Sequence, residues 1–387
     1  MRENKKSTLE AIICIVCIFA IFTGIGSKMG CINMINTIMQ TAFSLLTDTV
    51  LYIMAIAVVV GGFAGIVTEF GVINLVNRVL SPLMKPLYGL PGASIVGILT
   101  TFLSDNPAIL TLANDGNFKC HFKKYQLPAL TNIGTAFGMG LIIITFMIST
   151  TASSGNSCVI PALIGFLGAV IGSIVSTRLM LLKTKKVFGT EDMAIVQAEM
   201  DSIAVLPNDK KVVIKKSIGE RALTGVLDGG KNGVSVGIAI IPGVLIICTI
   251  VLLLTNGPSE DGSYTGAAYE GIALLPYLAE KINFILTPLF GFTSAECIAV
   301  PITSLGAAGA AIGLVPGLVS NSLAGGNDIA VFTAMCMCWS GYLSTHVAMM
   351  DSLKFRELTG HAILSHTIGG LCAGIGAHWA YVLYSVI

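Results

Sequence analysis

Apolar runs of about 20 residues recur along the whole of this 387-residue chain, and no stretch between them is long enough for an independent soluble domain. Only 11% of the residues are charged, whereas soluble domains carry roughly 25%. The mean hydropathy is +0.84. Because a globule of this size must cover itself with polar surface, this composition excludes a soluble fold. The sequence therefore predicts an all-α polytopic membrane protein.

A bilayer span needs about 20 apolar helical residues. This rule predicts spans at 9–26, 49–68, 128–149, 158–181, 234–255, 328–349 and 362–386. Two further apolar stretches, 92–113 and 293–315, are interrupted near their middles and predict re-entrant helical hairpins. A basic N-terminus followed by an apolar run also fits a secretory signal peptide, but no small-x-small cleavage site follows it. We therefore expect an uncleaved first membrane helix.

The distribution of basic residues predicts the orientation of the chain. If the N-terminus is cytoplasmic and each hairpin enters and leaves on one side, only Lys28 and Lys281 among the Lys and Arg residues fall outside. This bias follows the positive-inside rule. It predicts a multi-pass protein of the bacterial cytoplasmic (inner) membrane with a cytoplasmic N-terminus. The amphipathic stretch 218–233 predicts a helix lying on the cytoplasmic surface before the span at 234.

The two halves of the chain resemble each other. Residues 86–93 match 288–295, and 164–172 match 368–376 with nearly the same shift. The span 128–149 falls on 328–349, and a weaker match lays 34–68 on 217–252. Gly/Ala-rich apolar helices also resemble one another by chance, but a nearly constant shift over separated blocks favours a true repeat.

Combined with the orientation, the repeat is inverted in the membrane. The predicted organisation has four parts: an N-terminal membrane helix 1–33, a first repeat 34–181, a cytoplasmic linker 182–216 and a second repeat 217–387. Inverted repeats that each contain a broken segment are typical of secondary transporters, which bind substrate near the midplane.

The first hairpin breaks at 103–107, where Pro107 removes a backbone donor and forces Asn106 out of helical geometry. Ser104, Asp105 and Asn106 then offer a hydroxyl, a carboxylate and an amide at the tip. A charge at this depth costs at least about 2.5–3.5 kcal/mol, so Asp105 needs a cation, a proton or a polar ligand. Alternatively, Asp105 caps the helix that begins at Pro107.

The second hairpin breaks near 303–309, with glycines and two hydroxyls but no charge. The spans that follow the hairpins carry polar residues that either face the hairpin tips or join helices by hydrogen bonds. Asp328 is predicted to cap the start of a helix. The candidate substrate-binding residues are Thr101, Ser104, Asp105, Asn106, Asn132, Thr303, Ser304, Ser340 and His346, with Asp105 also the candidate ligand of a coupling ion.

Residues 219–255 resemble the corresponding segment of the concentrative nucleoside transporters. Residues 103–110 resemble that family's first hairpin tip, and 334–340 resemble the start of its substrate-contacting polar helix. The chain is still more similar to the bacterial nucleoside recognition, or Gate-domain, membrane proteins. The resemblance implies this scaffold and a homotrimer. The family's Gln-Thr-Glu is replaced here by Ser104-Asp105-Asn106, and its Asn-Glu-Phe motif has no counterpart.

These features favour a secondary transporter of a small polar solute, nucleoside-like or another metabolite, that is facilitative or coupled to Na⁺ or H⁺. We expect no other cofactor, no metal site and no nucleic-acid partner. An intramembrane enzyme is disfavoured because no usable GxSG motif with a distant His, and no pair of Asp residues, is present. The alternative is a non-transporting membrane partner or assembly factor of the sporulation type.

Overall fold

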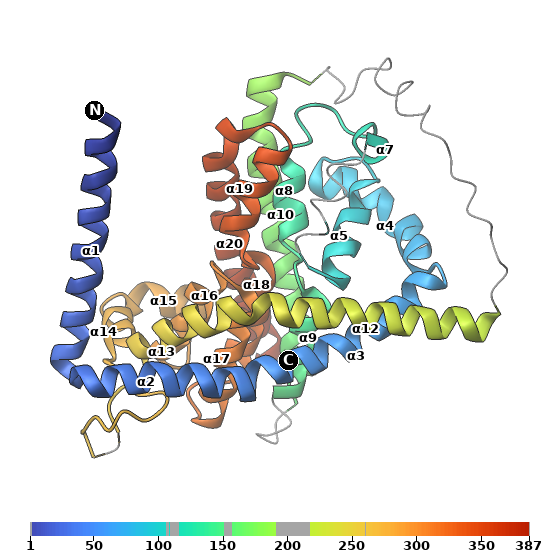
Figure 1. Ribbon diagram of the computed structural model, residues 1–387. Coiled ribbons are helices and arrows are strands. Elements are labelled where there is room, and N and C mark those ends of the chain that lie inside the picture. The colour runs from blue at the N-terminus through green and yellow to red at the C-terminus, as the bar shows by residue number, and fades with distance from the viewer. Residues whose placement is uncertain are drawn as a thin grey trace.

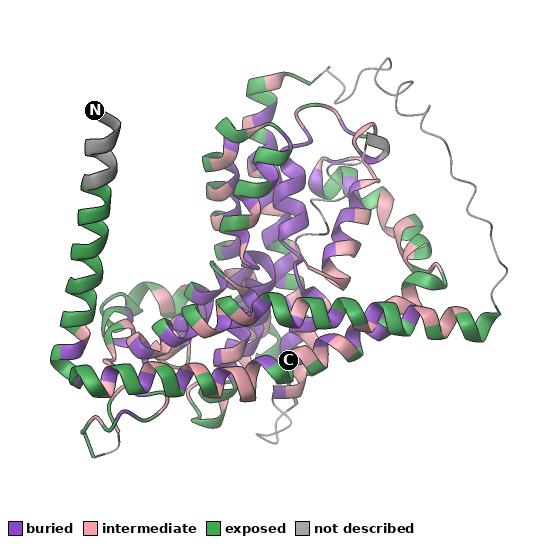
Figure 2. Cartoon of the chain, in the orientation of Figure 1, coloured by how far each residue is buried: buried purple, intermediate pink, exposed green. Residues whose placement is uncertain are grey.

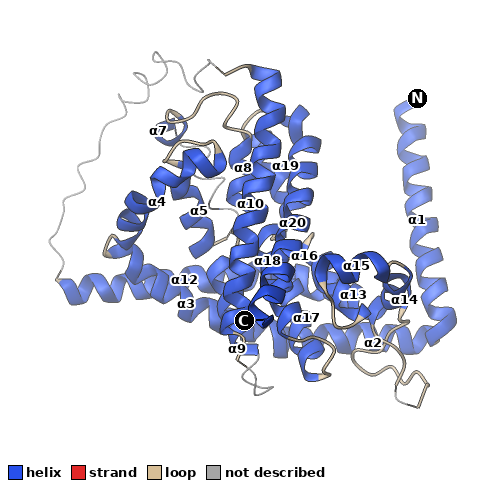
Figure 3. Cartoon of the chain, turned by 180° about the vertical axis from the view of Figure 1, so that it is seen from behind, coloured by secondary structure: helices blue, strands red, loops and turns tan. Residues whose placement is uncertain are grey.

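The chain folds into helices. The structure, a computed structural model, describes residues 2–105, 108, 116–150, 157–190, 217–259 and 261–386, and these residues contain no β-strand (Figures 1 and 3). The first half contains α1 (Arg2–Met29), α2 (Cys31–Ser44), η1 (Leu45–Val50), α3 (Leu51–Glu69), α4 (Val72–Tyr88), α5 (Ser94–Leu103), α7 (Gly116–Lys119), α8 (Ala129–Thr135), α9 (Gly140–Thr150) and α10 (Val159–Phe188). The second half contains α12 (Ile218–Pro242), η3 (Gly243–Cys248), α13 (Thr249–Thr255), α14 (Leu274–Lys281), α15 (Asn283–Phe290), η4 (Ala295–Ile298), α16 (Ala299–Ser304), α17 (Ala308–Ser320), α18 (Gly326–Trp339), α19 (Tyr342–Ser352), η5 (Arg356–Leu358) and α20 (Thr359–Val386).

Within the described residues, five helical segments are long and apolar enough to cross a membrane; four are continuous, and the fifth, 129–150, is interrupted between α8 and α9. They agree with the predicted spans at 9–26, 49–68, 128–149, 158–181 and 234–255, so the chain is a multi-pass membrane protein. The predicted span 328–349 is two helices, α18 and α19, interrupted at Ser340 and Gly341. The span 362–386 corresponds to α20, whose three histidines make it more polar than the five.

Two of these helices are much longer than a bilayer requires. α2, η1 and α3 form one helix of 39 residues, and α12, η3 and α13 form one of 38 residues. Each contains a π-helical turn, η1 or η3. The prediction of a separate surface helix over 218–233 was therefore wrong, because this stretch is collinear with the span that follows it.

The two long helices cross with their backbones in contact. A Cβ added to Gly61 of α3 would lie 2.5 Å from the carbonyl oxygen of Gly229 in α12, and Gly65 meets Gly225 in the same way. Residue numbers rise along one helix as they fall along the other, so the pair is antiparallel. Small residues at four-residue spacing permit this approach, which gains dispersion contacts that apolar lipid cannot replace.

A second antiparallel pair stands at the centre of the molecule (Figure 1). A Cβ on Gly172 of α10 would lie 2.5 Å from the Gly369 carbonyl oxygen of α20, and one on Gly168 would lie 2.6 Å from that of Ala373. α18 packs against both helices. Both antiparallel pairs join segments that the sequence repeat matches to each other, which supports the inverted relation of the halves.

Helix ends at corresponding positions of the predicted repeat have similar local structure. α4 ends at Gly89 (φ 71°) and α15 ends at Gly291 (φ 60°), both in the left-handed conformation that suits glycine. The side-chain amide of Gln126 donates to the Gly89 carbonyl at 3.1 Å, and that of Asn327 donates to the Gly291 carbonyl at 2.7 Å. In each half, this hydrogen bond thus holds the end of α4 or α15 against the start of the following polar span.

The buried core is formed mainly by α8, α9, α17 and α18 and by one face each of α10 and α20, and Figure 2 shows the buried residues, in purple, gathered at the centre of the molecule. α1 contributes little to this core, because only 6% of the residues in its most apolar stretch are buried. Its exposed Leu, Ile and Phe side chains therefore suit contact with lipid.

An ordered loop joins α13 to α14, described except at residue 260. The Glu270 carboxylate, 5% exposed, accepts hydrogen bonds from the Ser259 hydroxyl at 2.7 Å, the Thr265 amide and hydroxyl, and the Gly266 amide. Burial alone would raise the pKa of Glu270, but these hydrogen bonds together lower it to about 2.

Replacing Gly229 tests the helix crossing. We expect Gly229→Ala to lower the stability of the purified protein by about 1–3 kcal/mol, because its methyl group would overlap the Gly61 carbonyl. The matched control is Gly230→Ala, whose methyl group would meet Val58 at an ordinary 3.7 Å. Thermal unfolding in detergent measures both, and equal stability of the two variants would contradict the proposed contact.

The Glu270 loop should be sensitive to acid. Because the folded-state pKa is depressed, the carboxylate stabilises the loop above its unfolded pKa near 4.5, and this stabilisation is lost as the pH falls toward about 2. The protection factors of the amides in residues 261–273, which compare their hydrogen exchange with that of an unfolded chain at the same pH, should therefore fall over this window in the wild type. Glu270→Gln should exchange faster at neutral pH and depend less on pH; unchanged exchange in this variant would show that the carboxylate does not hold the loop.

Candidate functional site

The tip of the second predicted hairpin is a tight turn between α16 and α17. Thr303 and Ser304 are buried there, and their hydroxyls donate to carbonyls of their own helix, those of Ala299 and Pro301, both at 2.7 Å. Before the turn, α15 and the η4–α16 segment are bent by 75°. The tip meets the break between α18 and α19, because the Gly341 amide donates to the Ser304 carbonyl at 3.1 Å.

The first predicted hairpin is described only on its incoming side. α5 ends at Leu103, and Ser104 leaves helical geometry with φ −133° and ψ −115°. Thr101 is buried, with its hydroxyl on the carbonyls of Gly97 and Ile98. Asp105 is partly buried, and its carbonyl accepts from Ala108 at 3.0 Å. Asn106 and the return limb of this hairpin lie outside the described residues, as does the linker over 191–216.

The first hairpin also abuts a break in the span that follows it. α8 ends at Thr135 and α9 begins at Gly140, with Met139 in the left-handed region at φ 54°. The Phe102 ring occupies the space that a side chain on Gly140 would need. Met139 and Gly341, the latter at φ 60°, stand at corresponding positions of the repeat. The described limb of the first predicted hairpin and the tip of the second thus each pack against an interrupted membrane helix.

Beside the α18–α19 break lies a group of buried polar residues, which we call the histidine cluster: Asn132, Ser176, Tyr342, His346 and His366. The Asn132 amide donates to the Ser176 hydroxyl at 2.9 Å and to the Ala362 carbonyl at 3.0 Å. Ser176 lies 2.9 Å from His366 Nδ1, and His366 Nε2 lies 2.6 Å from the Cys338 carbonyl. A carbonyl only accepts, so Nε2 carries the proton and Nδ1 accepts from Ser176.

His346 completes the cluster. Its Nδ1 donates to the Tyr342 carbonyl at 2.9 Å, and its ring centroid lies 4.6 Å from that of His366. Its Nε2, the Oδ1 of Asn132 and the Nε1 of neighbouring Trp339 are buried without a hydrogen-bond partner among the described residues. Each such atom costs about 1–3 kcal/mol. The cluster therefore retains hydrogen-bonding capacity that a polar solute or water would satisfy.

The structure places the predicted residues in two groups. Thr101, Ser104, Asp105, Thr303 and Ser304 belong to the hairpin tips, while Asn132 and His346 belong to the histidine cluster. Ser340 is also buried and lies at the break between α18 and α19. The Asn132 amide contacts α10 and α20 through its described hydrogen bonds. Sequence reasoning missed Ser176 and His366, although a histidine within an apolar span was a detectable signal.

Asp328 has the capping role that the sequence predicts. Its carboxylate accepts from the Gly325 amide at 2.8 Å and from the Thr293 amide at 3.0 Å, and also contacts the Thr293 hydroxyl. It thereby joins the start of α18 to the entrance of the second hairpin. Within the described residues, no three His, Cys, Asp or Glu side chains form a group suited to a metal ion.

Removing the Ser176 hydroxyl tests the cluster. We expect Ser176→Ala to lower stability by about 1–3 kcal/mol. The variant leaves two buried groups without their hydrogen-bond partner, His366 Nδ1 and one N–H of the Asn132 amide. Thr177→Val is the control, since the neighbouring Thr177 hydroxyl is buried without a hydrogen-bond partner and its removal should be neutral or stabilising. Thermal unfolding in detergent compares the two; a Ser176→Ala protein as stable as Thr177→Val would refute the bonded chain.

Solved structures of a concentrative nucleoside transporter, CNTnw, are similar to this chain. CNTnw in an inward-facing, substrate-bound state gives a TM-score of 0.54 at 13% identity, covering 98% of this chain and 86% of that chain. A variant of CNTnw in the intermediate 1 state gives 0.53 at 12% identity, covering 97% and 87%. No family model and no curated protein matches the chain, so the resemblance to Gate-domain proteins stays a prediction. At these identities the likeness shows the fold: the chain has the all-helical architecture of the concentrative nucleoside transporter structures.

Proposed function

We propose that this protein is a secondary transporter, which moves a small polar solute across the bacterial cytoplasmic membrane by alternating access. The solute is nucleoside-like or another metabolite of similar polarity. One observation carries the proposal: each predicted hairpin ends against a break in the following membrane helix, at corresponding positions of an inverted repeat. Broken helices at depth are tolerated where they line a cavity, and transporters bind substrate where such segments meet.

The proposed substrate site lies between the two hairpin tips. Ser104, Asp105 and Asn106 would contribute from the first tip, and Thr303 and Ser304 from the second. The hydroxyls of Thr101, Thr303 and Ser304 donate to carbonyls of their own helices. They therefore contact a solute chiefly as acceptors, which favours solute groups that donate hydrogen bonds.

The helix-break side of the site would be formed by Ser340, with Asn132 and His346 behind it. The unpartnered Oδ1 of Asn132 and Nε2 of His346 are both acceptors when the imidazole is neutral. Their chemistry again matches a donor-rich solute, such as the hydroxyls of a sugar. Because these atoms are fully buried, the solute reaches them only when the hairpin or α19 moves.

Asp105 is the proposed ligand of a coupling cation. It is the one acid at either tip, and a carboxylate at this depth is stabilised by binding Na⁺ or a proton. The two hairpins would open alternately, one to each side, with the N-terminus in the cytoplasm. The resemblance to concentrative nucleoside transporters favours a homotrimer as the working unit.

Uptake into proteoliposomes tests the proposal. Radiolabelled uridine, adenosine and hypoxanthine are offered with and without inward Na⁺ or proton gradients. We expect the wild type to accumulate at least one solute and Asp105→Asn to reduce uptake by more than about tenfold, since a charged hydrogen bond contributes roughly 1.5–3 kcal/mol. Asp228→Asn is the matched control, because Asp228 is exposed and pairs with Lys231 on its own helix.

Binding is measured alongside uptake by thermal unfolding with each solute. A ligand at 100 times its Kd adds about 2.7 kcal/mol of stability. A folded wild type that neither binds nor accumulates any of these solutes would contradict the nucleoside-like substrate and favour the non-transporting membrane partner. Full uptake by Asp105→Asn would remove Asp105 from the coupling site.

A further inference from the structure

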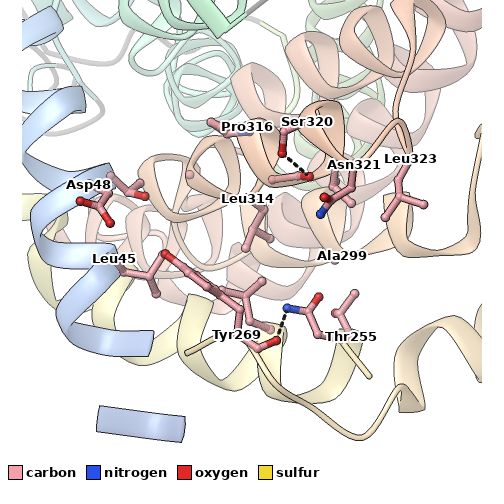
Figure 4. A pocket seen from close by; sticks show the side chains of 16 residues that line it. Leu45, Asp48, Thr255, Tyr269, Ala299, Leu314, Pro316, Ser320, Asn321 and Leu323 are labelled. Carbon is pink, nitrogen blue, oxygen red and sulfur yellow. Dashed lines mark hydrogen bonds between the residues drawn. The ribbon is translucent and has the colours of Figure 1, made fainter. Parts of the chain in front are cut away.

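A cavity separate from the hairpin tips lies beside the loop that joins α13 to α14 (Figure 4). Its volume is about 420 Å³, within the range of small-molecule sites. Its walls come from η1, α13, the loop residue Tyr269, and α17. Its polar lining includes Asp48, Tyr269 and Asn321, and its apolar lining includes Leu252, Leu314 and Leu318.

Asp48 gives this cavity its charge. Among the described residues that line it, no other is acidic and none is Lys, Arg or His. Asp48 makes no ion pair with any residue that the structure describes, and it accepts a hydrogen bond from the Thr47 hydroxyl next to it at 3.1 Å. A carboxylate on a long apolar membrane helix is costly unless water or a cation compensates it. Asp48 is exposed at the edge of the cavity, where water or a cation reaches its carboxylate.

The local backbone presents Asp48 to the cavity. Leu45, Asp48 and Thr49 all line it, and all belong to the π-helical turn η1. Such turns are rare and frequently occur at functional sites. Across the cavity, Gly313 and Gly317 lie four residues apart on α17, and Asn321 directly follows the end of this helix. In Figure 4, Asp48 and Asn321 lie on opposite sides with Tyr269 below them.

Tyr269 is fixed against this cavity. Its amide donates to the Thr41 hydroxyl at 2.9 Å, and its carbonyl accepts from the Asn256 side chain at 2.7 Å. Its backbone has the left-handed φ of 66°, rare for a residue with a side chain. Burial, and then the nearby Asp48 carboxylate, raise the pKa of the Tyr269 phenol. The phenol therefore stays protonated beside Asp48 and adds a polar group and an aromatic face.

The lining selects among ligand classes. A single carboxylate without basic residues disfavours anions. Ca²⁺ takes 6–8 oxygen ligands and Mg²⁺ an octahedral set, whereas this cavity offers one carboxylate and much apolar surface from Leu252, Leu314 and Leu318. A carboxylate, an aromatic ring and an apolar wall together suit an ammonium group attached to an apolar body.

We propose that this cavity is a binding site for a small organic amine, held by Asp48 through its ammonium group and by the leucines of α13 and α17 through its apolar part. The site is distinct from the proposed hairpin-tip site and does not rest on the proposed transport function. Because its walls belong to both a long composite helix and the second hairpin, a bound amine would favour the arrangement of α17 described here.

Calorimetric titration of the full chain in detergent tests this site. Benzylamine and benzyl alcohol are the probes, since they share size and shape and differ in charge. We expect saturable benzylamine binding, at least about tenfold tighter than that of benzyl alcohol. Asp48→Asn should remove this preference, while Asp228→Asn, at an exposed acid of α12, should preserve it.

A second variant tests the site without touching its charge. A side chain on Gly317 would enter open space, because no atom lies within 4 Å of its Cβ position. Gly317→Leu should therefore fill the cavity, leave the fold intact and abolish benzylamine binding. Equal affinity for the two probes, undiminished benzylamine binding in either Asp48→Asn or Gly317→Leu, or no binding to the folded wild type would overturn the proposal.

Discussion

Two helix crossings in which backbones touch determine how the rest of this molecule is arranged. Between helices in lipid there is no hydrophobic driving force, so association depends on close packing and on interhelical hydrogen bonds. Gly61 against Gly229 and Gly172 against Gly369 provide that packing, and each joins a helix to its own repeat equivalent. A pair of equivalent, antiparallel helices in contact defines the axis that relates the two halves. Once these crossings form, the hairpins and the interrupted helices have little choice of position.

The interrupted helices then impose a requirement of their own. In hydrocarbon every backbone polar group needs a partner inside the protein, and a break in a membrane helix releases several. At the α18–α19 break, the Gly341 amide is taken up by the Ser304 carbonyl. The hairpin tip is therefore part of what makes the break tolerable. In the proposed transport cycle, a hairpin that moves would exchange this bond for one to water or solute, so the backbone itself would couple conformational change to solute binding.

The sequence predicts most of the membrane spans because hydropathy depends only on composition over about 20 residues. It also predicts the Asp328 cap, which is a local pattern. It fails for 218–233, whose charged residues suggest a surface helix although a stripe of glycines from Gly225 to Gly237 packs against α3. Of the buried polar cluster, the sequence draws attention to Asn132 and His346 but not to Ser176 or His366, since pairing across helices depends on their three-dimensional arrangement. It also misses Asp48, because the π-turn that presents this residue has no recognisable sequence pattern.

The two hairpin tips differ in their chemistry, although the two halves of the molecule pack in a similar way. The first tip carries Asp105, whereas the corresponding second tip carries only hydroxyls and glycines. Gln126 and Asn327 perform the same capping task in the two halves, so structural roles are conserved across the repeat where chemical ones are not. In the proposed cycle Asp105 would bind the coupling cation or proton, so only the first hairpin would change its charge. An inverted repeat offers two equivalent gates, and a single acid at one tip would make their energetics unequal, which gives a symmetric scaffold a way to couple its movement to an ion.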